Sequence, residues 1–183
     1  AMAPAIKAYE LIKEQHLKPA DHLYVYTNLA NLYLVSGNLE QTEKIAEEGL
    51  KIKKWVVDLW FYLAKAQAMS KKFEEAIQSY KNYLYYLDNY DKYAADDIRI
   101  VSFTLRNKEE AQSDLDILYK ELERAKLSAN QEIEAYAQIV KTNIRQLIDQ
   151  GKFKEARELI LGFEQILPGD PEIREMKADI ESK

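Results

Sequence analysis

The sequence predicts an all-α protein that contains an internal repeat. Only five of the 183 residues are Gly and four are Pro, whereas helix-favouring Ala, Leu, Glu and Lys are abundant. Apolar residues make up 47% of the chain, which is enough to form a core. Two stretches also match each other at an offset of 34 residues. The matching pairs are Tyr26 and Trp60, Leu29 and Leu63, Ala30 and Ala64, Leu39 and Phe73, and Thr42 and Ala76. A fixed period of this length indicates a protein built from stacked helical units.

The first expected helix covers about residues 5–17, where apolar side chains recur at helical spacing. Pro19 interrupts this pattern, because it lacks an amide hydrogen and restricts the residue before it. Asp21 is the expected N-cap of the next helix. Two pairs of helices are then expected at 22–36 with 39–52 and at 56–70 with 73–89. The expected turns inside these pairs are Ser36-Gly37-Asn38 and Lys71-Lys72.

A further copy of the repeat is expected near the end of the chain. Gly151 and the aromatic Phe153 reproduce the turn and the residue after it, and Ala156 stands 12 residues before Pro168. Gly151 lies 114 residues after Gly37, which is not a multiple of 34. The unit between the matching copies must therefore be longer than its neighbours.

This longer middle unit is expected to contain helices at 97–105 and 108–127. The last helix is expected to start at Asp170, the N-cap, with Pro171 in the first helical position, and to end near Ile180. Its polar composition suits a helix that caps a stack of repeats and faces solvent.

Composition excludes several classes of function. The net charge is −5 with both signs mixed along the chain, whereas a nucleic-acid-binding protein needs a concentrated basic face. The longest apolar run, 59–64, is far shorter than the roughly 20 residues that span a bilayer.

Cysteine is absent, which fits a reducing compartment. The first residues, Ala-Met-Ala-Pro, do not form a signal peptide. We therefore expect a cytoplasmic fragment of a longer protein.

The repeated positions resemble the tetratricopeptide repeat (TPR), which has an aromatic, a Leu and small residues at this period. The resemblance implies pairs of antiparallel helices that stack into a right-handed solenoid with a concave face. It also implies a single domain, 1–183, with an irregular longer middle unit and a C-terminal capping helix. The implied units are repeats at 23–56, 57–90 and 137–170, a middle unit at 91–136 and a cap at 171–183.

In TPR proteins the first helix of each repeat lines the concave face. The implied partner-binding groove comprises Tyr24, Thr27, Asn28, Asn31 and Val35 in the first copy, Asp58, Phe61, Lys65 and Met69 in the second, and Gln138, Lys141, Thr142 and Arg145 in the last. Thr27 stands where a Lys of the clamp for acidic chaperone tails would be, and Asp58 would repel a carboxylate. A chaperone tail is therefore not the expected ligand.

No catalytic residue, metal or cofactor is expected, and the chain is not expected to be an enzyme. Asp114 and Asp116 match the sequence pattern of the acidic metal-binding motif of glycosyltransferases. However, side chains that are two residues apart on a helix point away from each other. His16 and His22 are the only histidines and lack the spacing of a zinc site.

The segment 80–93 is unusually rich in Tyr. Tyr80, Tyr83, Leu84 and Leu87 share one helical face and are expected in the core. Tyr85, Tyr86 and Tyr90 fall on other faces, and Tyr93 begins the following connection. Either packing against the middle unit or a partner surface would explain these residues.

The leading hypothesis is a non-catalytic scaffold that binds a protein or peptide along the concave face. The Tyr-rich segment and the irregular unit also resemble the repeat region of bacterial family 2 glycosyltransferases. That resemblance implies an accessory domain that holds the acceptor, dimerises the enzyme or contacts a catalytic domain in the same chain. Two further alternatives are a peptide-sensing regulator and a structural homodimer.

Overall fold

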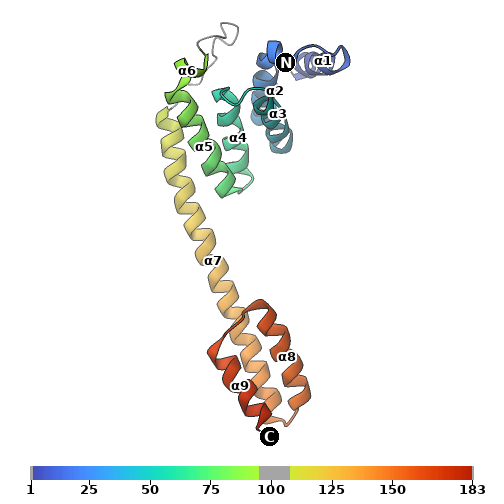
Figure 1. Cartoon of the computed structure of the whole chain (residues 1–183), viewed down its shortest axis with the longest axis vertical. Helices are drawn as coiled ribbons and strands as arrows, with labels where there is room; N and C mark the ends of the chain where they lie inside the picture. Colours follow the sequence, from blue (N-terminus) through green and yellow to red (C-terminus); the bar gives the residue numbers. More distant parts are fainter. Residues whose placement is uncertain (1, 95–107, 183) are drawn as a thin grey trace. The chain divides into compact units, whose positions relative to one another are not determined.

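The computed structural model describes residues 2–94 and 108–182, and every regular element within these ranges is helical (Figure 1). The prediction of an all-α protein is confirmed. The helices are α1 (Met2–Glu14), the 3₁₀ helix η1 (Pro19–His22), α2 (Leu23–Val35), α3 (Leu39–Ile52), α4 (Val57–Met69), α5 (Phe73–Asp88), α6 (Tyr90–Ala94), α7 (Lys108–Asp149), α8 (Phe153–Ile166) and α9 (Pro171–Glu181). The helix expected at 97–105 lies outside the described residues.

Helix α7 is much longer than predicted. A helix that ends near residue 127 was expected, but α7 continues without a break to Asp149. Its 42 residues contain neither Gly nor Pro, so no residue in the local sequence ends the helix. Gly151, whose φ of 71° is left-handed, ends it instead. The first helix expected in the last copy is therefore the C-terminal part of α7.

The same turn joins three pairs of helices. Gly37, Lys71 and Gly151 each adopt a left-handed φ, of 76°, 59° and 71°. In each turn this residue donates its backbone N–H to the carbonyl three residues earlier, and the next residue donates to the carbonyl five residues before it. This is the Schellman ending of a helix. The turns between α2 and α3, α4 and α5, and α7 and α8 thus share one backbone geometry, although the second uses Lys where Gly is preferred.

The predicted helix start at Asp21 is wrong. Pro19 begins the 3₁₀ helix η1, and Asp21 lies inside it, so His22 takes the N-cap position of α2 without a side-chain hydrogen bond. The corresponding prediction for α9 is confirmed, since the Asp170 carboxylate accepts hydrogen bonds from the backbone N–H groups of Glu172 and Ile173.

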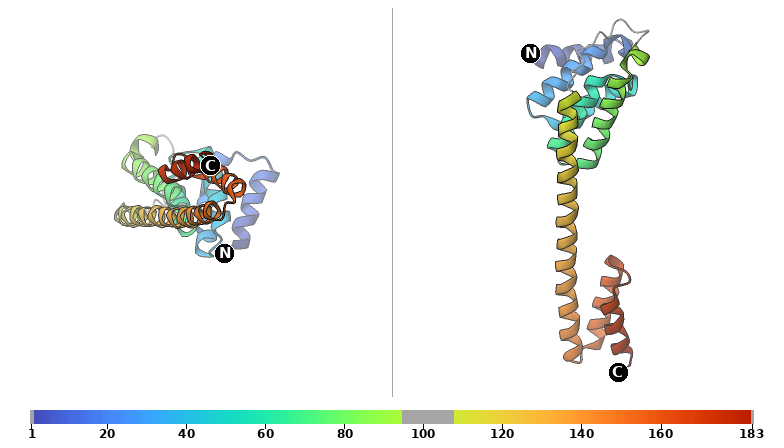
Figure 2. Two further views of the ribbon diagram at one scale, coloured as in Figure 1. Left: turned by 90° about the horizontal axis from the view of Figure 1, so that it is seen from below. Right: turned by 90° about the vertical axis from the view of Figure 1, so that its left-hand side faces the viewer.

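The contacts divide the chain into two compact units, Ala1–Glu123 and Arg124–Lys183. In the N-terminal unit α1 packs on α2, α3 packs between α2 and α4, and α5 packs on α4 (Figure 2). Ala30, Ala64 and Ala76 are completely buried, and their small side chains let neighbouring helices approach closely. The first turns of α7 complete this core with the buried Ala111 and Leu118.

In the C-terminal unit α8 and α9 lie beside the last part of α7 (Figure 2). The core consists mainly of aliphatic side chains from the three helices. Its most buried members are Ile144, Ala156, Ile160, Ile173 and Ile180. In contrast, every residue from Arg124 to Tyr136 is exposed.

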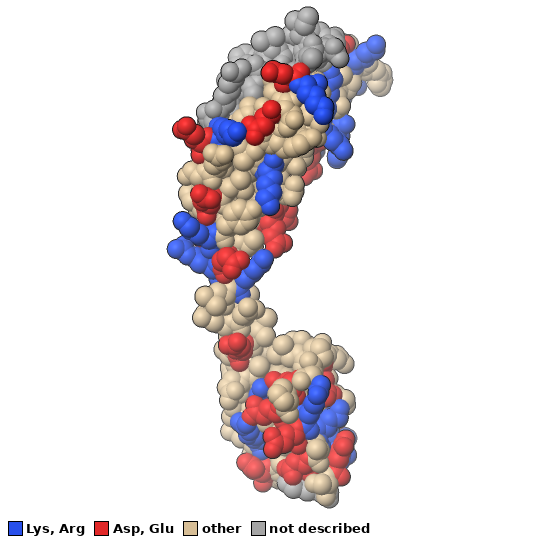
Figure 3. Space-filling model, turned by 60° about the vertical axis from the view of Figure 1, so that its left-hand side comes forward, with Lys and Arg blue, Asp and Glu red and all other residues tan. Residues whose placement is uncertain are grey.

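None of the described helices combines the length and apolar character needed to cross a bilayer. On the face shown in Figure 3, acidic and basic side chains are interspersed over the C-terminal unit. This face therefore carries no broad patch of a single sign.

Candidate functional site

Helix α2 presents an open row of side chains. Tyr24, Asn28 and Asn31 lie at positions i, i+4 and i+7 and are all exposed, Tyr24 by 55%. Thr27 is half-buried and donates its hydroxyl to the Tyr24 carbonyl, so this hydroxyl serves the helix itself. The row ends at Val35, which is 80% exposed. The residues expected to line a groove in the first copy are thus together and accessible.

The corresponding residues of α4 lie in a different environment. Asp58 and Phe61 are buried, with Phe61 only 5% exposed. The Phe61 ring contacts Tyr80 and Tyr83 of α5, at centroid distances of 6.0 and 5.3 Å. Phe61 therefore belongs to the core of the N-terminal unit. Only Met69, at the end of the helix, is exposed.

Lys65 is held by the beginning of α7. Its ammonium lies 2.7 Å from a Glu110 oxygen and 2.8 Å from an Asp114 oxygen. Burial lowers the pKa of Lys65, but the hydrogen bonds that its ammonium donates to both carboxylates outweigh this effect, and the pKa is raised. The Tyr80 hydroxyl donates to the same Asp114 carboxylate. Burial, followed by this hydrogen bond, raises the pKa of Tyr80.

This network also explains the acidic motif in α7. Asp114 faces Lys65 and Tyr80, Leu115 is buried and Asp116 is exposed. The prediction that the two carboxylates point away from each other is confirmed. In the described ranges 2–94 and 108–182, no group of three or more metal-ligating side chains is arranged to hold an ion.

The groove residues expected in the last copy hold α9 instead. The Lys141 ammonium lies 2.6 Å from Asp170 and 3.1 Å from Glu172, and Arg145 also pairs with Glu172. Thr142 donates its hydroxyl to the Gln138 carbonyl within α7. Lys141 and Arg145 therefore fasten the start of α9 within the C-terminal unit.

The Tyr-rich segment divides between core and surface. Tyr80 and Tyr83 are completely buried, which confirms their expected place in the core. Tyr85 is half-exposed and hydrogen-bonds to Tyr93. Tyr86 stacks on Trp60, with centroids 6.3 Å apart and planes only 8° from parallel.

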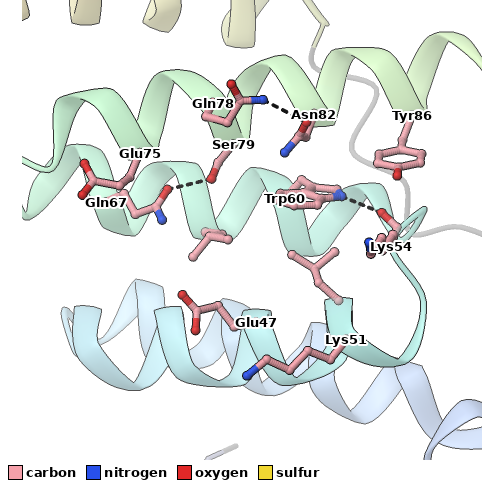
Figure 4. A pocket seen from close by; sticks show the side chains of 12 residues that line it. Glu47, Lys51, Lys54, Trp60, Gln67, Glu75, Gln78, Ser79, Asn82 and Tyr86 are labelled. Carbon is pink, nitrogen blue, oxygen red and sulfur yellow. Dashed lines mark hydrogen bonds between the residues drawn. The ribbon is translucent and has the colours of Figure 1, made fainter.

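The Trp60–Tyr86 pair lies at one end of a cleft that the sequence did not reveal. This cleft, of about 620 Å³, lies between α3, α4 and α5 (Figure 4). Its lining residues are Glu47, Leu50, Lys51, Lys54, Trp60, Leu63, Gln67, Glu75, Gln78, Ser79, Asn82 and Tyr86. We call it the α3–α5 cleft.

The two ends of the α3–α5 cleft differ in charge. Glu47 and Glu75 lie at the end near Gln67, and Lys54 lies at the end near the aromatic pair, whereas the Lys51 side chain extends along α3 toward Glu47 (Figure 4). The Trp60 indole N–H donates to the Lys54 carbonyl at 2.6 Å, which fixes the orientation of the ring. The cleft is therefore acidic at one end, basic and aromatic at the other.

Sequence reasoning missed this site because the repeat pattern placed Trp60 among packing positions. A signal was nevertheless present on α5, where Gln78, Asn82 and Tyr86 follow each other at intervals of four. Such spacing places three side chains with polar tips on one helical face. On α3, Glu47 and Lys51 have the same spacing.

Comparison with known proteins identifies no relative: no family model, no curated protein and no solved structure matches this chain.

Proposed function

We propose that the chain is a non-catalytic interaction module, built as a TPR-like solenoid, that binds a protein or peptide segment through the exposed row on α2. The shared turn geometry of three helix pairs supports repeated helical hairpins. The sequential packing of α2, α3, α4 and α5 also agrees with a stack in which each element contacts its neighbours.

The observation that carries this proposal is the character of the row itself. Tyr24 and Val35 offer apolar surface, and Asn28 and Asn31 between them offer amide donors and acceptors. Neither Asn side chain is engaged with another residue of the described ranges. The opposite side of α2, including Leu29 and Ala30, is buried, so the row is mounted on a rigid support.

This support reduces the entropic cost of binding, because the side chains are held on a packed helix before a partner arrives. Amide side chains can pair with the backbone of an extended segment, and a Tyr ring is a common anchor in interfaces. The corresponding part of α4 cannot add to such a groove while Phe61 is buried and Lys65 is paired with α7. The proposed binding surface is therefore restricted to α2.

The test is selection of a random peptide display library against the full chain. Enriched peptides should lose at least tenfold in affinity for the Tyr24→Ala/Asn31→Ala variant, as expected when an anchor and a hydrogen-bonding side chain are removed. Lys44→Ala, at an exposed position of α3, is the matched control and should bind like the wild type. Failure to enrich any peptide that binds the double variant at least tenfold more weakly than the wild type would overturn the proposal.

A further inference from the structure

We propose that the α3–α5 cleft is a second binding site, which holds an extended peptide of about five residues with a basic side chain at one end, an apolar one in the middle and an acidic one at the other. The site is separate from the row on α2 and does not depend on it. Its lining comes from the other side of α4, where Trp60, Leu63 and Gln67 are found instead of Phe61 and Lys65.

The length of the cleft sets the length of the peptide. Glu75 and Tyr86 mark its two ends on α5 (Figure 4). Eleven helical steps separate them, which corresponds to roughly 16 Å. An extended peptide advances about 3.3 Å per residue, so about five residues fit. Side chains of the first, third and fifth residues of such a peptide point to the same side and can all enter the cleft.

The charges at the ends determine which side chains fit. In the described part of the chain no ion pair joins the side chains of Glu47, Glu75, Lys51 or Lys54 to another side chain. Lys72, whose charge acts on both glutamates, is itself paired with Glu43 at 2.6 Å. The acidic end can therefore accept a basic residue, and the basic end can accept an acidic one.

The middle of the cleft is apolar apart from two buried polar side chains, Gln67 and Ser79. Leu50 and Leu63 line it, and an apolar side chain of the peptide would be removed from water against them. Gln67 is only 7% exposed, and its side-chain oxygen accepts the hydroxyl of Ser79 at 2.7 Å. Its amide nitrogen is turned toward the cleft (Figure 4), has no partner among the described residues and remains accessible to water.

A ligand that displaces water from this amide N–H must supply an acceptor, because the donor would otherwise be removed from water and left unpaired. The backbone carbonyl beside the central residue of an extended peptide supplies such an acceptor. The Gln67 amide thus favours a peptide over a purely apolar ligand, which would leave this donor unpaired.

The test uses the full chain and three labelled peptides, with fluorescence anisotropy and the NMR signal of the Trp60 indole N–H as readouts. Trp55→Phe assigns that signal, since the chain has only two Trp. The peptide Lys-Ser-Leu-Ser-Glu should bind and shift the Trp60 signal. Lys-Ser-Leu-Ser-Lys and Lys-Ser-Ser-Ser-Glu, which lack the acidic or the apolar side chain, should bind roughly tenfold more weakly.

A charge reversal keeps the test independent of folding. In Lys51→Glu/Lys54→Glu, affinity for Lys-Ser-Leu-Ser-Glu should fall roughly tenfold, and affinity for Lys-Ser-Leu-Ser-Lys should rise above it. Lys44→Glu, on the same helix but outside the cleft, is the control and should change neither affinity.

Three results would overturn the cleft proposal. These are no binding of Lys-Ser-Leu-Ser-Glu at millimolar concentration, equal binding of the three peptides, or loss of binding in Tyr24→Ala/Asn31→Ala with no loss in the charge-reversed variant. The last result would place the peptide on the α2 row. Because the two sites share no residue, failure here leaves the test of the proposed function unchanged.

Discussion

Gly49 sets the approach of α3 to its neighbours. It lies inside α3, where Gly is normally unfavourable. A Cβ atom at this position would collide with the Leu59 side chain and lie 3.2 Å from the Tyr26 Cβ. Leu59 is fully buried. Close packing, and not backbone conformation, therefore explains this glycine.

We predict that Gly49→Ala lowers the free energy of unfolding of the N-terminal unit by about 1–3 kcal/mol, the usual cost of overpacking. Gly162→Ala is the control. It also lies in a helix, but nothing lies within 4 Å of its added Cβ, so it should stabilise by about 0.5–1 kcal/mol. Urea denaturation followed by circular dichroism measures both, and a stabilised Gly49→Ala would show that α3 can move away from α4.

A second residue-scale effect concerns Tyr62. Burial, followed by the charge of Asp58, raises its pKa from 10.0 to about 12. The folded state thus favours the neutral phenol. Its contribution to stability is fully present below pH 10 and is lost as the pH rises toward 12.

We therefore predict that the wild type loses more stability than Tyr62→Phe between pH 8 and pH 11. Urea midpoints at the two values give the comparison, and Tyr24→Phe, at an exposed position, should follow the wild type. Identical pH dependence in the wild type and Tyr62→Phe would contradict a raised pKa at this position.

At the scale of elements, the first turns of α7 are held by both apolar and polar contacts. Ala111 and Leu118 enter the core of the N-terminal unit. Asp114 accepts the Tyr80 hydroxyl and pairs with Lys65. These polar contacts fix the rotation of α7, because a turn of the helix about its axis would leave a buried hydroxyl without a partner.

We predict that Asp114→Ala costs about 1–3 kcal/mol of stability, since the Tyr80 hydroxyl stays buried and unpaired. Asp116→Ala removes the same charge from an exposed position of the same helix, and should change stability by less than about 0.5 kcal/mol. Adding Tyr80→Phe to Asp114→Ala should recover part of the loss. Equal effects of the two Asp variants in urea denaturation would rule out this account.

At the scale of the whole molecule, the two compact units share one helix. α7 contributes Ala111 and Leu118 to the core of the first unit, and Val140 and Ile144 to the core of the second. Between these contacts, residues 124–136 are exposed on all sides. Most helical stability in proteins comes from packing of one face of the helix against other elements. This segment has no buried face.

We predict that backbone amides of 124–136 exchange with deuterium faster than those of 137–147 in the same helix. The first group can open without breaking tertiary contacts, whereas the second is held by the core of the C-terminal unit. Residue-resolved hydrogen exchange measures the difference directly. Equal protection of the two groups would mean that the exposed segment is covered in solution.

Much of the architecture could be predicted because its signals are local. Helices are indicated by apolar residues that recur at helical spacing. The turn at Gly37 and the Asp170-Pro171 start determine where helices end and begin, through backbone geometry within a few residues. One local signal led to a wrong prediction: Asp21 was expected to be an N-cap, but it lies inside the 3₁₀ helix that Pro19 begins. One helix was expected to end near residue 127 and another to begin near residue 137. The structure has the single helix α7 there, because no Gly or Pro lies between these positions.

The sequence by itself determined the helical class, the repeated hairpin turns and the small residues at helix contacts. Tertiary structure alone decided which faces remain open. Phe61 and Lys65 are covered or paired because Tyr80, Glu110 and Asp114 come to meet them from later helices. Trp60 and Gln67, on another face of the same helix, line a cleft instead. A helix presents several faces with similar local sequence, and only distant segments that pack across it determine which of them remains accessible to a partner.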